Sequence, residues 1–145
     1  MYRKLDRNAP FSLRRDVYLG CLKFYGEEHK QSIVEACSYA SSLSSLKRFE
    51  EARAILRKAI PVARRILGDD YALTIGMRGN YARAFYRDPD ATLHDIREAV
   101  NMLEELYLAA WRVHGGAQPT VAGVKRSLRF ARKALRARET PPGSA

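Results

Sequence analysis

A repeated pattern of small, aromatic and acidic residues constrains this chain more than any other feature of its sequence. Its landmarks are Gly26, Tyr39-Ala40, Leu43, Glu51-Ala52 and Leu56, which return as Gly68, Tyr81-Ala82, Phe85, Glu98-Ala99 and Leu103. The offset is 42 residues from Gly26 to Gly68 but 47 from Ala52 to Ala99, so the second copy holds five extra residues. A period of this length, made of two helical patterns, indicates helix pairs that bury a core by stacking on their neighbours.

The spacing of apolar residues predicts six helices, at 11–25, 29–46, 48–66, 70–87, 93–113 and 119–138. No stretch alternates between apolar and polar residues as a strand would. The expected class is therefore all-α, a right-handed α-solenoid of antiparallel helical hairpins. The extra residues fall at 88–92, where Pro89 cannot continue a helix. They predict a surface loop that tolerates deletion, with Thr92 or Asp90 capping the next helix.

The repeat also predicts how the chain is divided. We expect an N-terminal lead-in at 1–10, a repeat domain at 11–138 and a disordered tail at 139–145, which contains Pro141-Pro142-Gly143. Within the domain, the half unit 11–26 precedes the full units 27–68 and 69–115, and the half unit 116–138 follows. Half units leave apolar helix faces open, which favours either a homo-oligomer through the terminal half-repeats or a fragment of a larger solenoid.

Composition restricts the partners and the chemistry. The 145 residues carry a net charge of +10, which attracts polyanions such as nucleic acid or acidic peptides. No apolar run reaches the roughly 18 residues of a membrane span, so we expect no membrane association. Two cysteines without metal-ligand spacing favour reduced thiols and a cytoplasmic location. His29, His94 and His114 lie far apart, so we expect no metal, no cofactor and no enzyme activity.

The landmarks resemble the tetratricopeptide repeat over roughly residues 11–138. That family places a small residue between two large ones in its first helix, as in Tyr39-Ala40 with Leu43, and an acidic-Ala pair in its second helix, as in Glu51-Ala52. The linker Leu67-Gly68-Asp69-Asp70-Tyr71-Ala72-Leu73-Thr74 is similar to that of the kinesin-light-chain type. The resemblance implies a non-catalytic adaptor or scaffold that holds a partner peptide in a groove.

Family geometry, projected onto the first helix of each unit, implies which residues line that groove. They are Ser38, Ser41, Asn80, Arg83, Tyr86, Arg129, Arg132 and Arg136. Such a groove becomes basic towards the C-terminus and suits an acidic peptide held by arginine forks and an amide side chain. Two alternatives remain open. The last three arginines are merely the solvated face of a terminal helix, or a basic stripe at Arg57-Lys58 and Arg64-Arg65 binds nucleic acid.

Two small residues in the helix predicted at 70–87 need an explanation. Gly76 and Gly79 each cost about 1 kcal/mol in a helix interior. We interpret them as sites of close helix packing, with ligand contact as the alternative. On the family pattern, Ala40 and Ala82 should occupy equivalent buried sites.

Overall fold

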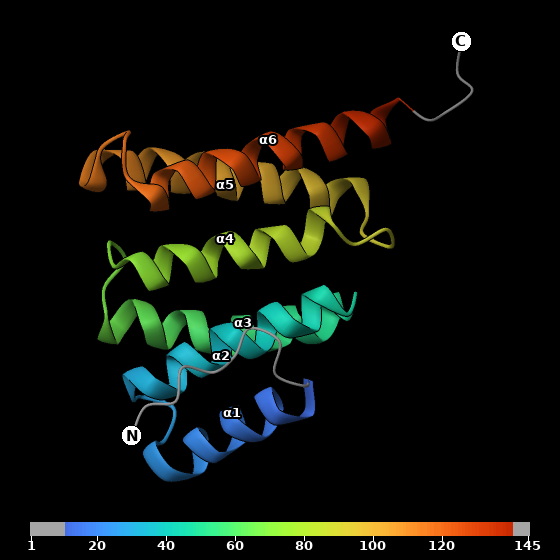
Figure 1. Ribbon diagram of the computed structural model, residues 1–145. Coiled ribbons are helices and arrows are strands. Elements are labelled where there is room, and N and C mark those ends of the chain that lie inside the picture. Colours follow the sequence, from blue (N-terminus) through green and yellow to red (C-terminus); the bar gives the residue numbers. More distant parts are fainter. Residues whose placement is uncertain (1–10, 141–145) are drawn as a thin grey trace.

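The computed structural model describes residues 11–140, and six helices account for most of this span (Figure 1). They are α1 (Phe11–Tyr25), α2 (Lys30–Ser45), α3 (Phe49–Ile66), α4 (Ala72–Tyr86), α5 (Leu93–His114) and α6 (Pro119–Glu139). No strand occurs among the described residues. The predicted all-α solenoid is confirmed, and the expected helix boundaries differ from the observed ones by no more than two residues.

The helices stack as hairpins along one direction. Each helix packs against the next one in sequence, and α4 also contacts both α2 and α6. Figure 1 shows α2, α4 and α6 one above another on the side facing the viewer, with α3 and α5 behind them. These three helices therefore form one face of the molecule, while α1 contacts only α2.

The repeated glycines mark the places where the chain turns from one hairpin to the next. Gly26, Gly68 and Gly115 follow α1, α3 and α5 and have positive φ angles of 81°, 93° and 76°. Side chains with a Cβ rarely adopt this conformation, so glycine at these positions ends each helix and redirects the chain. The glycines that recur in the sequence repeat therefore mark the ends of α1, α3 and α5.

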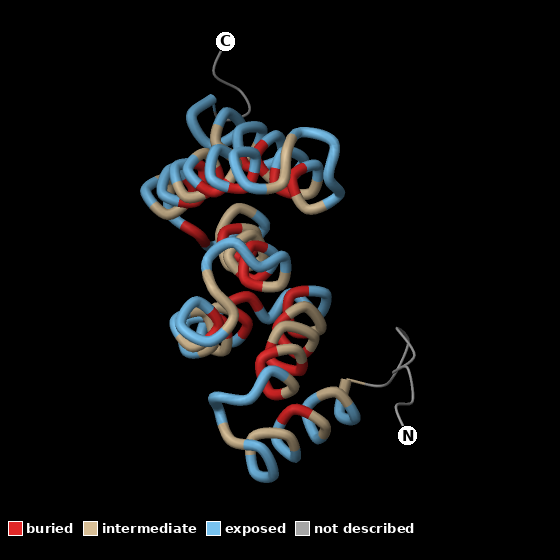
Figure 2. Tube along the Cα trace, turned by 90° about the vertical axis from the view of Figure 1, so that its left-hand side faces the viewer, coloured by how far each residue is buried: buried red, intermediate tan, exposed pale blue. Residues whose placement is uncertain are grey.

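Two apolar clusters form the core, and α4 contributes to both. One joins side chains of α1, α2 and α3 to Met77, and the other joins Ile75 and Ala82 to α5 and α6. Buried positions lie between the helices in Figure 2. Ala40 and Ala82 are 1% and 0% exposed, which confirms that both are buried as expected. Because a methyl group fills each site, neighbouring helices can approach closely.

The five extra residues of the second copy lengthen both the loop after α4 and the first turn of α5. Leu93, the first residue of α5, lies six positions before Ala99, whereas Phe49 starts α3 three positions before Ala52. Thr92 caps α5: its Oγ1 accepts from the backbone N–H of Asp95, whose carboxylate accepts from the N–H of Thr92, each at 3.1 Å. The expectation that Thr92 or Asp90 caps this helix is therefore confirmed for Thr92.

This loop is held from two sides, contrary to the expectation that it is dispensable. Asp88 forms an ion pair with Arg53 of α3, and Ala91 is buried. Arg138 of α6 donates to the carbonyl oxygens of Ala91 and Pro89 at 2.7 and 2.6 Å. Deleting residues 88–92 would leave both arginines without these partners, so we expect the deletion to destabilise the protein.

The C-terminal boundary also differs from the expectation. The disordered tail was expected to begin at residue 139, but Glu139 is the last residue of α6 and accepts a hydrogen bond from Arg97 at 3.3 Å. The expected lead-in at 1–10 and residues 141–145 of the tail lie outside the described residues.

Candidate binding groove

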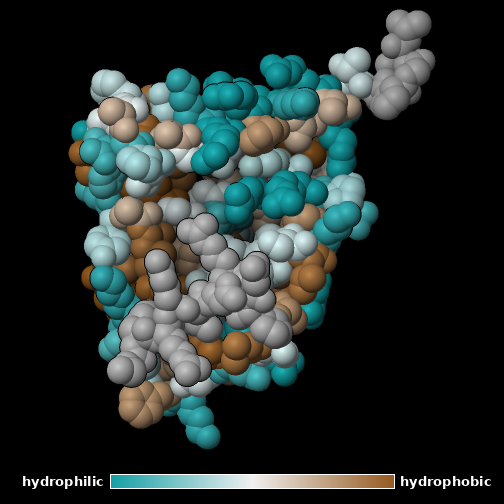
Figure 3. Space-filling model, viewed as in Figure 1, coloured by the Kyte–Doolittle hydropathy of each residue, from teal (hydrophilic) through white to brown (hydrophobic). Residues whose placement is uncertain are grey.

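A groove of about 940 Å³ lies between α4 and α6, on the face shown in Figure 3. The two helices run in the same direction and form its walls (Figure 1). Its lining residues on α4 and at its C-terminal end are Ala72, Ile75, Gly76, Gly79, Asn80, Arg83, Tyr86 and Arg87; those on α6 are Pro119, Thr120, Gly123, Val124, Arg126, Ser127, Phe130, Lys133, Ala134 and Ala137. The groove is therefore lined by side chains from two successive units of the repeat.

Four cationic side chains line this groove: Arg83, Arg87, Arg126 and Lys133. Its described lining residues include no carboxylate. Within residues 11–140, none of the four forms an ion pair with Asp or Glu. Arginines elsewhere do so, for example Arg132 with Glu104 at 3.1 Å. Like charges gathered on two facing walls without counter-charges create a positive potential that attracts an anionic ligand.

Two aromatic residues stand among these cations. The side chain of Phe130 is about half exposed. Burial raises the pKa of the Tyr86 phenol, while a hydrogen bond from Ser127 and the charges of Arg83 and nearby arginines act in the opposite direction. Tyr86 of α4 and Ser127 of α6 thus lie close to each other on opposite walls of the groove. The groove offers aromatic surface as well as charge.

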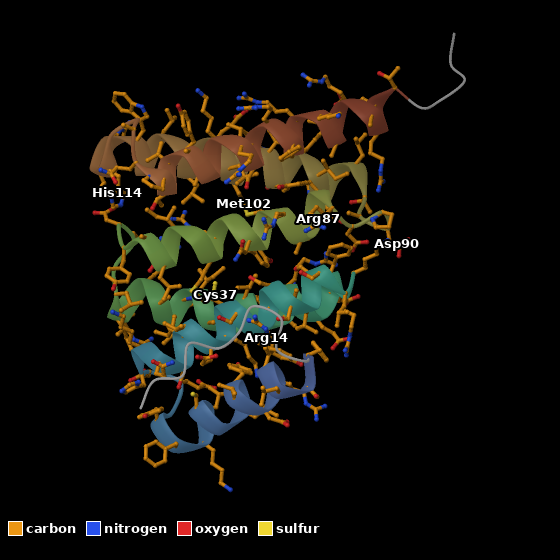
Figure 4. All side chains as sticks on the ribbon, in the orientation of Figure 1. Arg14, Cys37, Arg87, Asp90, Met102 and His114 are labelled. Carbon is orange, nitrogen blue, oxygen red and sulfur yellow. The ribbon has the colours of Figure 1, made fainter. Side chains whose placement is uncertain are left out.

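Asn80 connects the groove to α2. Its amide nitrogen donates to Ser41 Oγ at 3.4 Å and lies 3.6 Å from Cys37 Sγ. Burial raises the pKa of the Cys37 thiol, and Asn80 and Arg83 oppose this shift. Figure 4 labels Cys37 beside α4. The Asn80 side chain is therefore held in place by α2, with its amide nitrogen engaged inside the protein.

The residues predicted from family geometry separate into two groups. Asn80, Arg83 and Tyr86 line the groove, and Ser41 supports Asn80 from α2. Ser38 lies on the same helix, half buried, and accepts a hydrogen bond from the Ser42 hydroxyl through its backbone carbonyl. Neither serine lines the space between α4 and α6.

Arg129, Arg132 and Arg136 lie elsewhere, in a second hollow between α5 and α6. The expectation that they share a groove with Asn80 and Arg83 is not met. A groove between two stacked helices is lined by the side of each helix that faces the other. In the groove between α4 and α6, these are opposite sides of the two helices. Positions equivalent to Arg83, such as Arg132 one residue after the buried Ala131, therefore face away from α4.

The sequence interpretation missed several lining residues for the same reason. Arg126, Phe130 and Lys133 follow one another at spacings of four and three residues, which places them on one face of α6. That spacing is visible in the sequence. That this face of α6 points towards α4 becomes clear only once the buried positions Leu128 and Ala131 are known. Arg87 was missed because it was expected near the end of the helix, beyond the projected groove positions.

The glycines of α4 do not serve helix packing. A Cβ atom placed on Gly76 or Gly79 would meet no atom of any other helix within 4 Å. The interpretation of these residues as close-packing sites is therefore wrong. Both line the groove instead, as does Gly123 of α6, where a Cβ would also meet nothing within 4 Å.

Three further features of residues 11–140 bear on function. No group of three or more His, Cys, Asp or Glu side chains in this span is arranged to hold a metal ion. None of its helices combines the length and apolar character needed to cross a bilayer. Both cysteines, Cys21 and Cys37, are free thiols.

The fold defines a helical-repeat protein with a groove between the first helices of successive units. Comparison with protein families adds that residues 40–70 match the Tetratricopeptide repeat. This stretch covers the end of α2, all of α3 and the linker that contains Gly68. No match was found among curated proteins. The family match supports a repeat of the tetratricopeptide type, and hence a module for protein–protein interaction.

Proposed function

We propose that this protein is a non-catalytic adaptor whose groove between α4 and α6 binds an acidic segment of a partner protein. The observation that carries the proposal is the set of four cations on the two groove walls, none of them paired with a carboxylate within residues 11–140. A carboxylate can accept two parallel hydrogen bonds from one guanidinium, which gives arginine a geometric advantage in such recognition. The resemblance of the linker to the kinesin-light-chain type is in keeping with adaptor work, and the free thiols with a cytoplasmic location.

The groove is also prepared for binding by the way its walls are built. Asn80 is held by its hydrogen bond to Ser41 of α2, and Tyr86 is partly buried. Side chains that are already ordered lose less conformational freedom when a ligand arrives. The proposed mechanism is therefore recognition by preformed helices, with long-range attraction from the net charge of +10 adding to the association rate.

A selection of peptides tests this proposal. A displayed library of random twelve-residue peptides is enriched on the wild-type protein at physiological salt, and the tightest peptide is synthesised with a fluorescent label. We expect peptides rich in Asp and Glu. Affinity is then measured by fluorescence polarisation for a groove double variant, Arg83→Glu with Arg126→Glu, and for a matched control, Arg57→Glu with Lys58→Glu on the exposed side of α3.

The two double variants change the net charge by the same amount, so position alone distinguishes them. We expect a loss of at least about tenfold in affinity for the groove variant and less than about threefold for the control, because contacts across the groove are local and exposed charges are screened beyond roughly 8 Å. Equal losses that fade together as salt rises would contradict the proposal. They would instead support nonspecific polyanion binding, including the alternative of nucleic acid.

A further inference from the structure

The groove between α4 and α6 changes character along its length. Because the two helices run in the same direction, one end of the groove is formed by the beginnings of both helices. The residues at that end are uncharged: Ala72, Ile75, Gly76, Gly79, Pro119, Thr120, Gly123 and Val124. All four groove cations come later in the chain than these residues of each wall: Arg83 in α4 and Arg87 just after it, and Arg126 and Lys133 in α6. Figure 4 labels Arg87 at the charged end, far from His114, which marks the other end of the hairpins.

The same division is visible on the surface. In Figure 3, hydrophobic residues gather towards the left of the hollow between α4 and α6, and hydrophilic residues towards its right. Ile75 and Val124 are largely buried and form apolar walls at the first end. A carboxylate placed there would lose water without gaining a cation. Apolar side chains of a ligand placed at the other end would remove water from the guanidinium groups without accepting their hydrogen bonds.

Three glycines make the uncharged end deeper. Gly76, Gly79 and Gly123 lie inside helices, where glycine is less favourable than alanine. Apart from the adjoining residues and the backbone of the same helix, no atom lies within 4 Å of a Cβ built on any of them. The missing side chains therefore leave the backbone of α4 and α6 bare over open space. Another polypeptide can lie in direct contact with this backbone, as it could not if alanines or larger residues stood there.

We propose that the partner segment is divided like the groove: its acidic residues lie among Arg83, Arg87, Arg126 and Lys133, and a stretch of small or apolar residues packs on the glycine-lined end. This inference rests on the proposed function and adds the order of residues in the ligand and its contact with the helix backbone. From Pro119 to Ala137 the groove wall is about 27 Å long at 1.5 Å per helical residue. That length accommodates about eight residues of extended chain.

The order of residues is tested with the twelve-residue peptides selected on the wild-type protein. We expect their Asp and Glu residues to gather in one half and small or apolar residues in the other. A second peptide of the same composition, with its acidic residues dispersed, should bind at least about tenfold more weakly in the polarisation assay. Equal affinity of the two peptides would overturn the proposed division.

The contact with the helix backbone is tested with Gly79→Ala, matched by Gly20→Ala. Gly20 is an exposed glycine inside α1 with no atom within 4 Å of a built Cβ, so both substitutions should leave Tm unchanged or higher. Gly79→Ala should weaken binding of the selected peptide at least about fivefold, and Gly20→Ala should leave it unchanged. Unchanged binding by Gly79→Ala would overturn the backbone contact.

The outcomes separate this inference from the function on which it rests. If acidic peptides are selected and the Arg83→Glu, Arg126→Glu variant loses binding, but residue order and Gly79→Ala have no effect, the adaptor function stands and the inference fails. If no acidic peptides are selected, the proposed function is wrong and the inference fails with it.

Discussion

Arg53 of α3 and Asp88 in the loop after α4 form an ion pair across two units of the repeat, with Arg53 Nη1 3.1 Å from Asp88 Oδ2 and both side chains only 12% exposed. Arg53 also donates to the carbonyl oxygen of Ala84 at 2.6 Å, and its guanidinium lies over the ring of Phe85. One arginine thus fixes the end of α4 to the preceding hairpin. The groove depends on this end, because Arg87 follows directly after α4.

Replacing Arg53 with alanine should therefore destabilise the protein by about 2–4 kcal/mol, since Asp88 would remain largely buried without its partner. Arg57→Ala, one turn further along α3 and exposed, should change the free energy of unfolding by no more than about 0.5 kcal/mol. Urea unfolding monitored by circular dichroism measures both. Equal stabilities of the two variants would show that the ion pair contributes little.

Deleting residues 88–92 should destabilise the protein by more than Arg53→Ala does. The deletion removes Asp88, the buried Ala91 and the cap of α5 together, and it leaves Arg138 without its carbonyl partners. Thermal unfolding of the deletion variant checks this. A variant with the wild-type Tm would restore the view of these residues as a simple surface insertion.

Ala82→Leu should cost about 1–3 kcal/mol, because Ala82 is fully buried where α4 packs on α5 and α6, and three additional carbon atoms would overfill that site. Ala54→Leu is the matched control, since Ala54 is an exposed alanine on α3. Leucine and alanine differ little in helix propensity, so the control should stay within about 0.5 kcal/mol of wild type. Denaturant midpoints measure the difference, and indistinguishable midpoints would argue against close packing at Ala82.

The capping box of α5 should make stability depend on pH at low pH. Hydrogen bonds from the backbone and side chain of Thr92 hold the pKa of Asp95 below its ordinary value of 3.8. A lowered folded-state pKa stabilises the fold above the unfolded-state pKa, and this contribution is lost as pH falls through the folded-state value. Asp95→Asn should therefore lower stability at pH 7 by about 0.5 kcal/mol, and the difference from wild type should shrink below pH 3.8. Urea unfolding at pH 7 and at acid pH tests it, with a pH-independent difference contradicting the assignment.

Amide hydrogen exchange should be fastest, among the six described helices, in α1. This helix packs on α2 alone, and Leu13 and Phe24 are 45% and 80% exposed, as expected for a half unit. Local opening of α1 exposes little additional apolar surface, so its free energy should be low. Mass-spectrometric exchange at several protein concentrations measures it. Protection of α1 that rises with concentration would indicate that a second copy covers this face.

Much of the fold follows from sequence alone because its determinants are local. Helix stops require glycine at positive φ, and Gly26, Gly68 and Gly115 reveal the period directly. A small residue between large ones, as at Ala40 and Ala82, marks the buried stripe of each first helix. Apolar spacing at 3.6 residues then gives the helices themselves. These signals were sufficient for the class, the helix order and the helix boundaries.

The groove was predictable only in part, because it depends on how one helix is rotated against another. Asn80, Arg83 and Tyr86 lie on the edge of α4 that faces α6, but Arg132 occupies the corresponding edge of α6 and faces away. Equivalent positions in successive repeat units lie on the same edge of their helices. A groove between two neighbouring helices is lined by opposite edges of those helices, so repeat equivalence alone cannot identify both of its walls. The role of Gly79 likewise depends on atoms from other helices, which periodicity does not contain.

The amino-acid sequence by itself thus determined the repeat, the six helices and the basic character of the molecule, because backbone conformation, burial periodicity and charge are properties of short segments. Only the tertiary structure decided which cations face one another across the groove and which glycines expose helix backbone to it. It also decided that the loop at 88–92 is fastened by Arg53 and Arg138. The hydrogen bonds of Arg53 and Arg138 join residues more than 30 positions apart, and packing alone brings them within contact distance.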